Sequence, residues 1–311
     1  MSRYIAGRLL QLVPVLLIIS VIVFAIMRVL PGDPAQLMLA GAEGGAVTPQ
    51  RLEELREQMG LNAPTHVQYL RFVGHALIGD FGNSIRFRSP VSELILDRFG
   101  STLALASVGL AAAILIGLPL GMIAAVRQNS WIDALSMALA YIGASMPVFW
   151  LGLLLILGFS FGLGWFPPAG GSGLRALVLP ALTLGLVSAG IISRLIRSSL
   201  VEVLEEDYIR TGRAKGLSER VLLWRHGLGN ALIPVITMAG LQFGAMLAGA
   251  VVTETVFSRP GVGRLVVSAI LWKDYPLVQG CVLFMAVAYL LVNLLVDISY
   301  AWLDPRIRYR S

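Results

Sequence analysis

Long apolar runs alternate with short charged segments along this chain, and that alternation limits the possible folds more than any other feature. Residues 9–30 form an almost unbroken apolar run. A helix rises about 1.5 Å per residue, so this run crosses a hydrocarbon layer of about 30 Å. Only 14% of the residues are charged, whereas soluble domains carry roughly 25%. The sequence therefore predicts an all-α, polytopic membrane protein.

Six apolar segments are long enough to be predicted as transmembrane helices. The first run is too long for the apolar part of a cleaved signal peptide, about 7–15 residues, so we expect it to be retained as a span. Pro119 and Pro147 interrupt two of the segments, which neighbouring helices or water can accommodate. The predicted spans cover approximately residues 9–30, 101–126, 131–164, 177–193, 232–253 and 277–302.

The chain divides into three predicted parts. Residues 1–30 form a cytoplasmic N-terminus and the first span, 31–98 a polar external cap, and 99–311 a five-span core with a cytoplasmic loop at 194–231. Pro31-Gly32-Asp33-Pro34 is expected to end the first helix, because proline removes a backbone donor and restricts the preceding residue. The short segments expected inside are the more basic ones, which places both termini in the cytoplasm.

The longest predicted cytoplasmic segment, Ser193–Pro234, is unusually basic. It can hold two short helices separated by Lys215-Gly216-Leu217, with Gly216 taking a positive φ or allowing close backbone approach. Ser218 can cap the second helix, and Glu219 suits the positive end of its dipole. This pattern favours a surface held by another protein, and the alternative is a solvated loop that only sets topology. Its basic residues are Arg194, Arg197, Arg210, Arg213, Lys215, Arg220 and Arg225.

Glycines spaced four residues apart recur in the predicted spans and indicate close helix–helix packing. The pairs are Gly117/Gly121, Gly158/Gly162 and Gly240/Gly244.

No energy source is visible in the chain. A phosphate-binding loop needs Gly-Lys followed by Ser or Thr, but Lys215 and Lys273 are the only lysines and follow Ala214 and Trp272. ATP hydrolysis of that form is excluded, and we predict neither an enzyme nor a cofactor or metal in this chain. The single Cys281 excludes an internal disulfide.

Few residues in the predicted spans could couple transport to a proton or sodium gradient. Coupled carriers usually bury carboxylates in mid-span, and the candidates here are Asp297, with Asn293 and Gln242 as further polar residues. What remains is a helical pore or half-pore that takes its energy from elsewhere, with a stand-alone secondary carrier or channel as the competing class. The net charge of +6 is attributed to topology and attraction to lipid headgroups, not to nucleic acid.

Residues 207–217, Asp-Tyr-Ile-Arg-Thr-Gly-Arg-Ala-Lys-Gly-Leu, resemble the cytoplasmic coupling loop of ABC importer permeases. The resemblance is strongest to the branch of dipeptide, oligopeptide, glutathione and nickel permeases. The chain departs from the general pattern, since Arg210-Thr211-Gly212 stands in place of Glu-Ala-Ala, and Gly212 in place of the alanine usual in this branch. Further matching motifs are Arg225-His226, Asn230-Ala231, Ile233-Pro234, Leu30-Pro31-Gly32-Asp33-Pro34, Gly79-Asp80-Phe81-Gly82, Ser145-Met146-Pro147, Glu254-Thr255-Val256-Phe257, Pro260-Gly261-Val262-Gly263, Asp274-Tyr275-Pro276 and Asp304-Pro305-Arg306.

The resemblance implies one of two homologous permease subunits of an importer in the bacterial inner membrane. Two ATPase subunits, which hold ATP and Mg²⁺, would bind inside, and a solute-binding protein would dock outside. The cargo would be dipeptides, oligopeptides or glutathione, carried inward by alternating access, with nickel or another small solute as the alternative. The residues implied in ATPase coupling are Asp207, Arg210, Thr211, Arg213, Ala214, Lys215 and Gly216.

On the outer side we assign docking of the binding protein to residues 31–98 and gating to the loop 254–276. The loop follows a predicted span, so it can move with the pore. The alternative interpretation is that the loop is an inert connector between spans. Substrate-binding residues are not predicted. The predicted gating residues are Glu254, Arg259, Pro260, Gly261 and Gly263.

Overall fold

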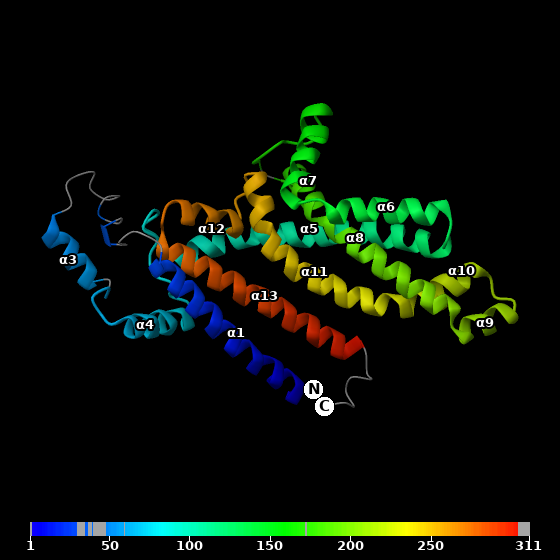
Figure 1. Cartoon of the computed structure of the whole chain (residues 1–311), viewed down its shortest axis with the longest axis horizontal. Helices are drawn as coiled ribbons and strands as arrows, with labels where there is room; N and C mark the ends of the chain where they lie inside the picture. Colours follow the sequence, from blue (N-terminus) through cyan, green and yellow to red (C-terminus); the bar gives the residue numbers. More distant parts are fainter. Residues whose placement is uncertain are drawn as a thin grey trace. The chain divides into compact units, whose positions relative to one another are not determined.

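The computed structural model describes residues 2–29, 35–36, 39, 48–58, 60–171 and 173–303, and these are largely helical (Figure 1). The described part contains no strand, only an isolated bridge between Asn83 and Pro90, so the all-α prediction is confirmed. Pro31-Gly32-Asp33-Pro34 and the basic tail at 304–311 lie outside the described residues. The helices are α1 Ser2–Val29, α3 Pro49–Gln58, α4 Thr65–Leu77, α5 Val91–Val126, α6 Trp131–Ser145, α7 Val148–Leu155, the π-helix η1 Ile156–Gly162, α8 Arg175–Glu205, α9 Asp207–Ala214, α10 Glu219–Val221, the π-helix η2 Leu222–Gly227, α11 Leu228–Val256, α12 Val262–Leu271 and α13 Tyr275–Leu303.

The spans follow the apolar runs, with one exception. Five helical segments of the described chain are long and apolar enough to cross a membrane, and a sixth span results if α6 and α7–η1 are counted together. These two are bent by 108°, so the third predicted span is not one straight helix. Met146 and Pro147 are both extended, at ψ 137° and 133°, and for Met146 this is expected because it precedes a proline. Pro119, in contrast, lies inside the continuous helix α5.

By packing, the described residues form two compact units. One contains residues 103–259 and 291–303, and the other contains 2–102 and 260–290. Helices α5 and α13 each contribute residues to both. The predicted division into an N-terminal span, an external cap and a core concerns roles and stays a prediction.

In the first unit, α8 runs between α6 and α11 and contacts both, as well as α7 (Figure 1). Two glycines of α5 allow its close approach to α8. A Cβ atom on Gly117 would lie 2.6 Å from the carbonyl oxygen of Ala189, and one on Gly121 would also clash with the α8 backbone. The packing prediction is confirmed for this pair. It is wrong for Gly158, where an added Cβ would meet nothing within 4 Å.

In the second unit, the beginnings of α5 and α13 pack with α12 around an apolar core. Asp274 is fully buried and accepts hydrogen bonds from the Ser84 hydroxyl and the Arg86 backbone N–H. The segment 254–276 is therefore not a loop, as predicted, but contains a packed helix, and it shares a core with residues of the expected cap. The core residues are Val91, Ile95, Val262, Leu265, Ala269, Leu277, Val278 and Cys281.

Helix α4 of the same unit contacts α1. The Tyr69 hydroxyl hydrogen-bonds the Ser20 hydroxyl at 2.9 Å, and the Phe24 ring lies against both Tyr69 and Phe72. At the end of α4 the Leu77 side chain is 82% exposed, so the contacts with α1 come from earlier residues of this helix.

Candidate functional site

The predicted coupling segment is a compact helix–turn–helix at the C-terminal end of α8, where α9 and α10 lie together (Figure 1). Glu206 leaves the helical conformation at ψ 148°, and its carbonyl oxygen accepts hydrogen bonds from the backbone N–H groups of Ile209 and Arg210, at 3.0 and 3.2 Å. Asp207 stands in the first turn of α9, where a carboxylate stabilises the helix dipole. The chain therefore turns sharply between α8 and α9.

Gly216 ends α9 in a left-handed conformation with φ 80°. The Leu217 N–H donates to the Gly212 carbonyl at 3.2 Å, and the Gly216 N–H donates to the Arg213 carbonyl at 2.9 Å. These two bonds define a Schellman motif, which satisfies carbonyl groups at a helix end. A Cβ atom on Gly216 would meet nothing within 4 Å. Of the two reasons proposed for this glycine, positive φ is confirmed and close backbone approach is wrong.

An ion pair spans the break between the two helices. Arg213 donates to both carboxylate oxygens of Glu219, at 2.7 and 3.2 Å, and these hydrogen bonds raise the pKa of Arg213. Arg210 lies 3.7 Å from the Asp207 carboxylate. Both arginines predicted to face an ATPase therefore have partners within the chain, and those partners compete with any external carboxylate.

The second helix differs from the prediction. Ser218 occupies the N-cap position, but its side chain makes no capping hydrogen bond. Its carbonyl oxygen accepts a hydrogen bond from the Leu222 N–H at 3.0 Å. From α10 the helical conformation continues through η2 into α11 without a break. Because α10 covers only three residues, the second helix is the beginning of a longer one rather than an independent element.

Buried side chains fix α9 to the helices beside it. Ile209 and Leu222 are almost completely buried, and an added Cβ on Gly212 would lie 2.6 Å from Cδ2 of Leu222. Gly212 thus provides room for Leu222, a role that the sequence did not reveal. The Tyr208 hydroxyl donates to the His226 carbonyl and accepts from the Asn230 side chain, at 3.3 and 2.9 Å. These contacts join α9 to η2 and α11.

The remaining predicted coupling residues also lie on or next to α9. The Thr211 hydroxyl bonds back to the Asp207 carbonyl at 2.8 Å, Ala214 is the last helical residue, and Lys215 follows it. The structure thus places all seven predicted residues within one short helix and its C-terminal cap. Their arrangement offers exposed charge on a packed helix, and their role in ATPase coupling stays a prediction.

The predicted gating residues belong to different packed units. Glu254 is fully buried near the end of α11, and Arg259 is part of the same unit. Burial lowers the pKa of Arg259, although the Glu254 carboxylate opposes that effect. Pro260, Gly261 and Gly263 belong to the second unit, at the start of α12. Their gating role stays a prediction.

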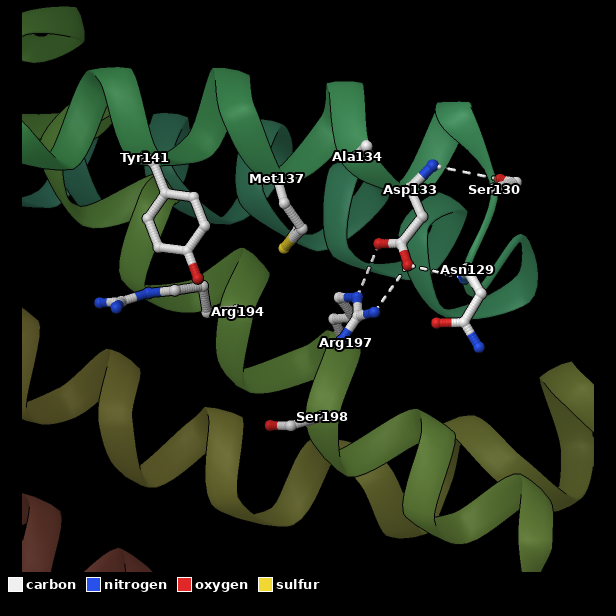
Figure 2. Close-up of a pocket in the computed structure, with 9 residues that line it drawn as sticks. All are labelled: Asn129, Ser130, Asp133, Ala134, Met137, Tyr141, Arg194, Arg197 and Ser198. Carbon is white, nitrogen blue, oxygen red and sulfur yellow. Dashed lines mark hydrogen bonds and ion pairs between the residues drawn. The ribbon is translucent and has the colours of Figure 1, made fainter.

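The sequence analysis missed one polar site, which joins α6 to α8 (Figure 2). Arg197 donates to both carboxylate oxygens of Asp133, through Nε at 2.7 Å and Nη2 at 2.6 Å. The Asp133 backbone N–H bonds the Ser130 hydroxyl, and the Asn129 N–H bonds the Asp133 carboxylate. The available signal was Ser130 three residues before Asp133, a helix-start pattern, but it does not identify the arginine. In the described residues no three His, Cys, Asp or Glu side chains gather closely enough to hold a metal ion.

A multi-pass helical protein with a helix–turn–helix at one end of its central helix fits a transport subunit, and comparison with known families agrees. Residues 117–309 match the family described as "Binding-protein-dependent transport system inner membrane component", and residues 1–106 match the corresponding N-terminal family. The chain therefore belongs to this family, the inner-membrane permeases of ABC importers.

Individual relatives show which members of this family the chain resembles. The chain is 48% identical over 310 residues to the glutathione transport system permease protein GsiC of Salmonella paratyphi A and 46% identical to that of Escherichia coli K12, covering 100% of each sequence. Among solved structures, the MetNI methionine ABC transporter aligns with a TM-score of 0.59 at 20% identity, over 68% of this chain and 96% of that one. At this identity the structural likeness supports the fold alone.

Proposed function

We propose that this chain is the permease subunit of an importer that carries glutathione, or a short peptide resembling it, into the cell. The observation that carries the proposal is the 46–48% identity, over the full length, to permeases named for glutathione transport. Nickel or another small solute handled by the same branch is the alternative cargo.

The proposed assembly contains a second, homologous permease, two ATPase subunits and an external solute-binding protein. The ATPase subunits bind ATP and Mg²⁺ and contact α9 from the cytoplasm. In this arrangement both chain termini lie on the cytoplasmic side as well. The exposed charges of Asp207 and Arg210 on α9 and of Lys215 at its C-terminal cap support this assignment, because charged groups at an interface rim guide association and fix register.

The proposed mechanism is alternating access driven by movement of α9. Because Ile209 buries one side of α9 and the Tyr208–Asn230 hydrogen bond joins α9 to α11, α9 moves as a lever with the helices that it contacts. Closure of the ATPase pair on ATP shifts α9, and the contacts of α8 with α6, α7 and α11 distribute that shift. Packed interfaces of this kind change between discrete arrangements rather than bending continuously.

Reconstitution tests the proposal. The chain is purified with its partner subunits, placed in liposomes, and supplied with binding protein outside and ATP inside. We expect ATP-dependent uptake of labelled glutathione, with less uptake of Ni²⁺. Uptake by this chain alone, without ATPase subunits, would identify a stand-alone carrier. Uptake of Ni²⁺ but not glutathione would establish the alternative cargo.

A further inference from the structure

The pocket beside the Asp133–Arg197 ion pair is an open hollow of about 640 Å³ between α6 and α8, within the first unit (Figure 2). Neither the proposed coupling site nor the proposed gating residues include it. It is lined by Asn129, Ser130, Asp133, Ala134, Met137, Tyr141, Arg194, Arg197 and Ser198.

The lining changes from polar to apolar along α6. Asn129 and Ser130 lie at the beginning of the helix, and Ala134, Met137 and Tyr141 follow at spacings of three and four residues. Residues at these spacings share one face of a helix. The pocket therefore offers both polar and apolar surface and suits an amphipathic ligand.

The charge of the lining is positive. Arg197 is engaged by Asp133, whose side chain is only 7% exposed. Arg194 is exposed, its guanidinium lies 5.4 Å from the centre of the Tyr141 ring, and it forms no ion pair with the described carboxylates. Since two arginines face one carboxylate, the pocket keeps about one uncompensated positive charge and favours an anion.

The pocket lies at the level of a membrane surface. Residues 127–130 form the short turn between α5, which is long enough to cross a membrane, and α6, the first part of the bent candidate span. Trp131, next to that turn, is 73% exposed. Tryptophan and tyrosine concentrate where hydrocarbon meets headgroups. Helix α8 has 31 residues, about 46 Å, which exceeds the roughly 30 Å of hydrocarbon. Its C-terminal part, which bears Arg194 and Arg197, therefore reaches the headgroup layer.

We propose that this pocket binds the phosphate headgroup of an anionic phospholipid. Arg194 supplies the main contact, Arg197 supplies a second through the guanidinium nitrogen that Asp133 does not use, and an acyl chain lies along Ala134 and Met137. Basic pockets between membrane helices are suited to such headgroups, and arginine matches phosphate geometry. Because α8 continues directly into α9, the lipid belongs to the cytoplasmic leaflet, an assignment that rests on the proposed function.

The test uses the assembled complex in mixed micelles of phosphatidylglycerol and phosphatidylcholine, and native mass spectrometry counts the lipids retained. The wild-type complex is expected to prefer phosphatidylglycerol. Arg194→Ala should reduce that preference about tenfold, because a direct hydrogen bond to a charged group is lost, and Arg194→Lys should restore part of it. Arg127→Ala is the matched control, since Arg127 is exposed on the same turn but does not line the pocket.

Several results would overturn the proposal. Equal losses in Arg194→Ala and Arg127→Ala would mean that general surface charge, not the pocket, selects the lipid. Displacement of the lipid by millimolar inorganic phosphate or glutathione would assign the pocket to a soluble anion. Retention of lipid by the separated chain but not by the complex would mean that a partner subunit covers the pocket. The two proposals fail in different measurements. If the wild-type complex retains the lipid but shows no ATP-dependent uptake of glutathione, the proposed transport function is wrong and the lipid site is not.

Discussion

Gly216 is the residue whose conformation most directly shapes the proposed coupling site. At φ 80° it ends α9 and allows the Arg213–Glu219 ion pair to form across the turn. A residue with a Cβ atom loses roughly 1–2 kcal/mol in this conformation, whereas asparagine tolerates it better. The space around Gly216 is open, so this cost arises from the backbone and not from a clash.

We therefore expect Gly216→Val to uncouple ATP hydrolysis from uptake while membrane insertion stays normal. The altered turn would displace Glu219 from Arg213 and change the angle between α9 and α10. Gly216→Asn, the matched control, should retain most of the activity. ATP hydrolysis and glutathione uptake are measured on the same liposomes. Normal uptake by the valine variant would contradict a mechanical role for this turn.

The two arginines of α9 give a second prediction at the residue scale. Arg213 and Glu219 are 44% and 70% exposed, and exposed ion pairs contribute about 0–1 kcal/mol. The double variant Arg210→Ala, Arg213→Ala should lower the yield of co-purified ATPase, because charge is lost from the proposed contact surface. Glu219→Ala breaks the same internal pair but leaves both arginines, so its yield should be unchanged. Equal losses in the two variants would instead indicate that the internal pair matters.

At the scale of elements, the sequence predicted what local patterns encode. Apolar runs located the spans, and the Lys215-Gly216-Leu217 sequence located the break after α9, because both depend on neighbouring residues. The Asp133–Arg197 pair joins residues 64 apart, and the Ser84–Asp274 bond joins residues 190 apart. No periodicity records such pairings. The Met146-Pro147 break could be anticipated from proline, but its 108° angle could not, since packing sets the angle.

Helix packing provides a prediction with an internal control. Gly117→Ala would place a methyl group 2.6 Å from the Ala189 carbonyl oxygen in α8, and overpacking of this kind typically costs about 1–3 kcal/mol. Gly158→Ala adds the same methyl group where nothing lies within 4 Å. We expect the first variant to lower the unfolding temperature of the purified complex and the second to leave it unchanged or raise it slightly. Similar effects of the two would show that the approach of α5 to α8 is not tight.

At the scale of the whole molecule, the proposed external docking and gating segments cannot be treated as independent. Asp274 is buried and hydrogen-bonded to Ser84 and Arg86, and the Val262 N–H bonds the Thr102 hydroxyl at 2.9 Å. A deletion across 258–263 would remove the buried Val262 and damage this core. The proposed docking and gating roles are therefore better separated by substitutions at exposed positions and by removal of a peripheral helix than by that deletion.

Pro260 is exposed and lies next to the boundary between the two packed units. Proline fixes φ, whereas glycine adds conformational freedom. Pro260→Gly should therefore slow uptake by weakening the transmission of movement from Arg259 to α12, without changing affinity for the binding protein. Removal of α3 should do the reverse, because this polar helix offers exposed charge for docking, and none of its described side chains belongs to the apolar core of the second unit. Uptake rates and binding-protein titrations are measured on both variants. Normal uptake by Pro260→Gly, with unchanged binding, would leave the segment before α12 as a connector without a gating role.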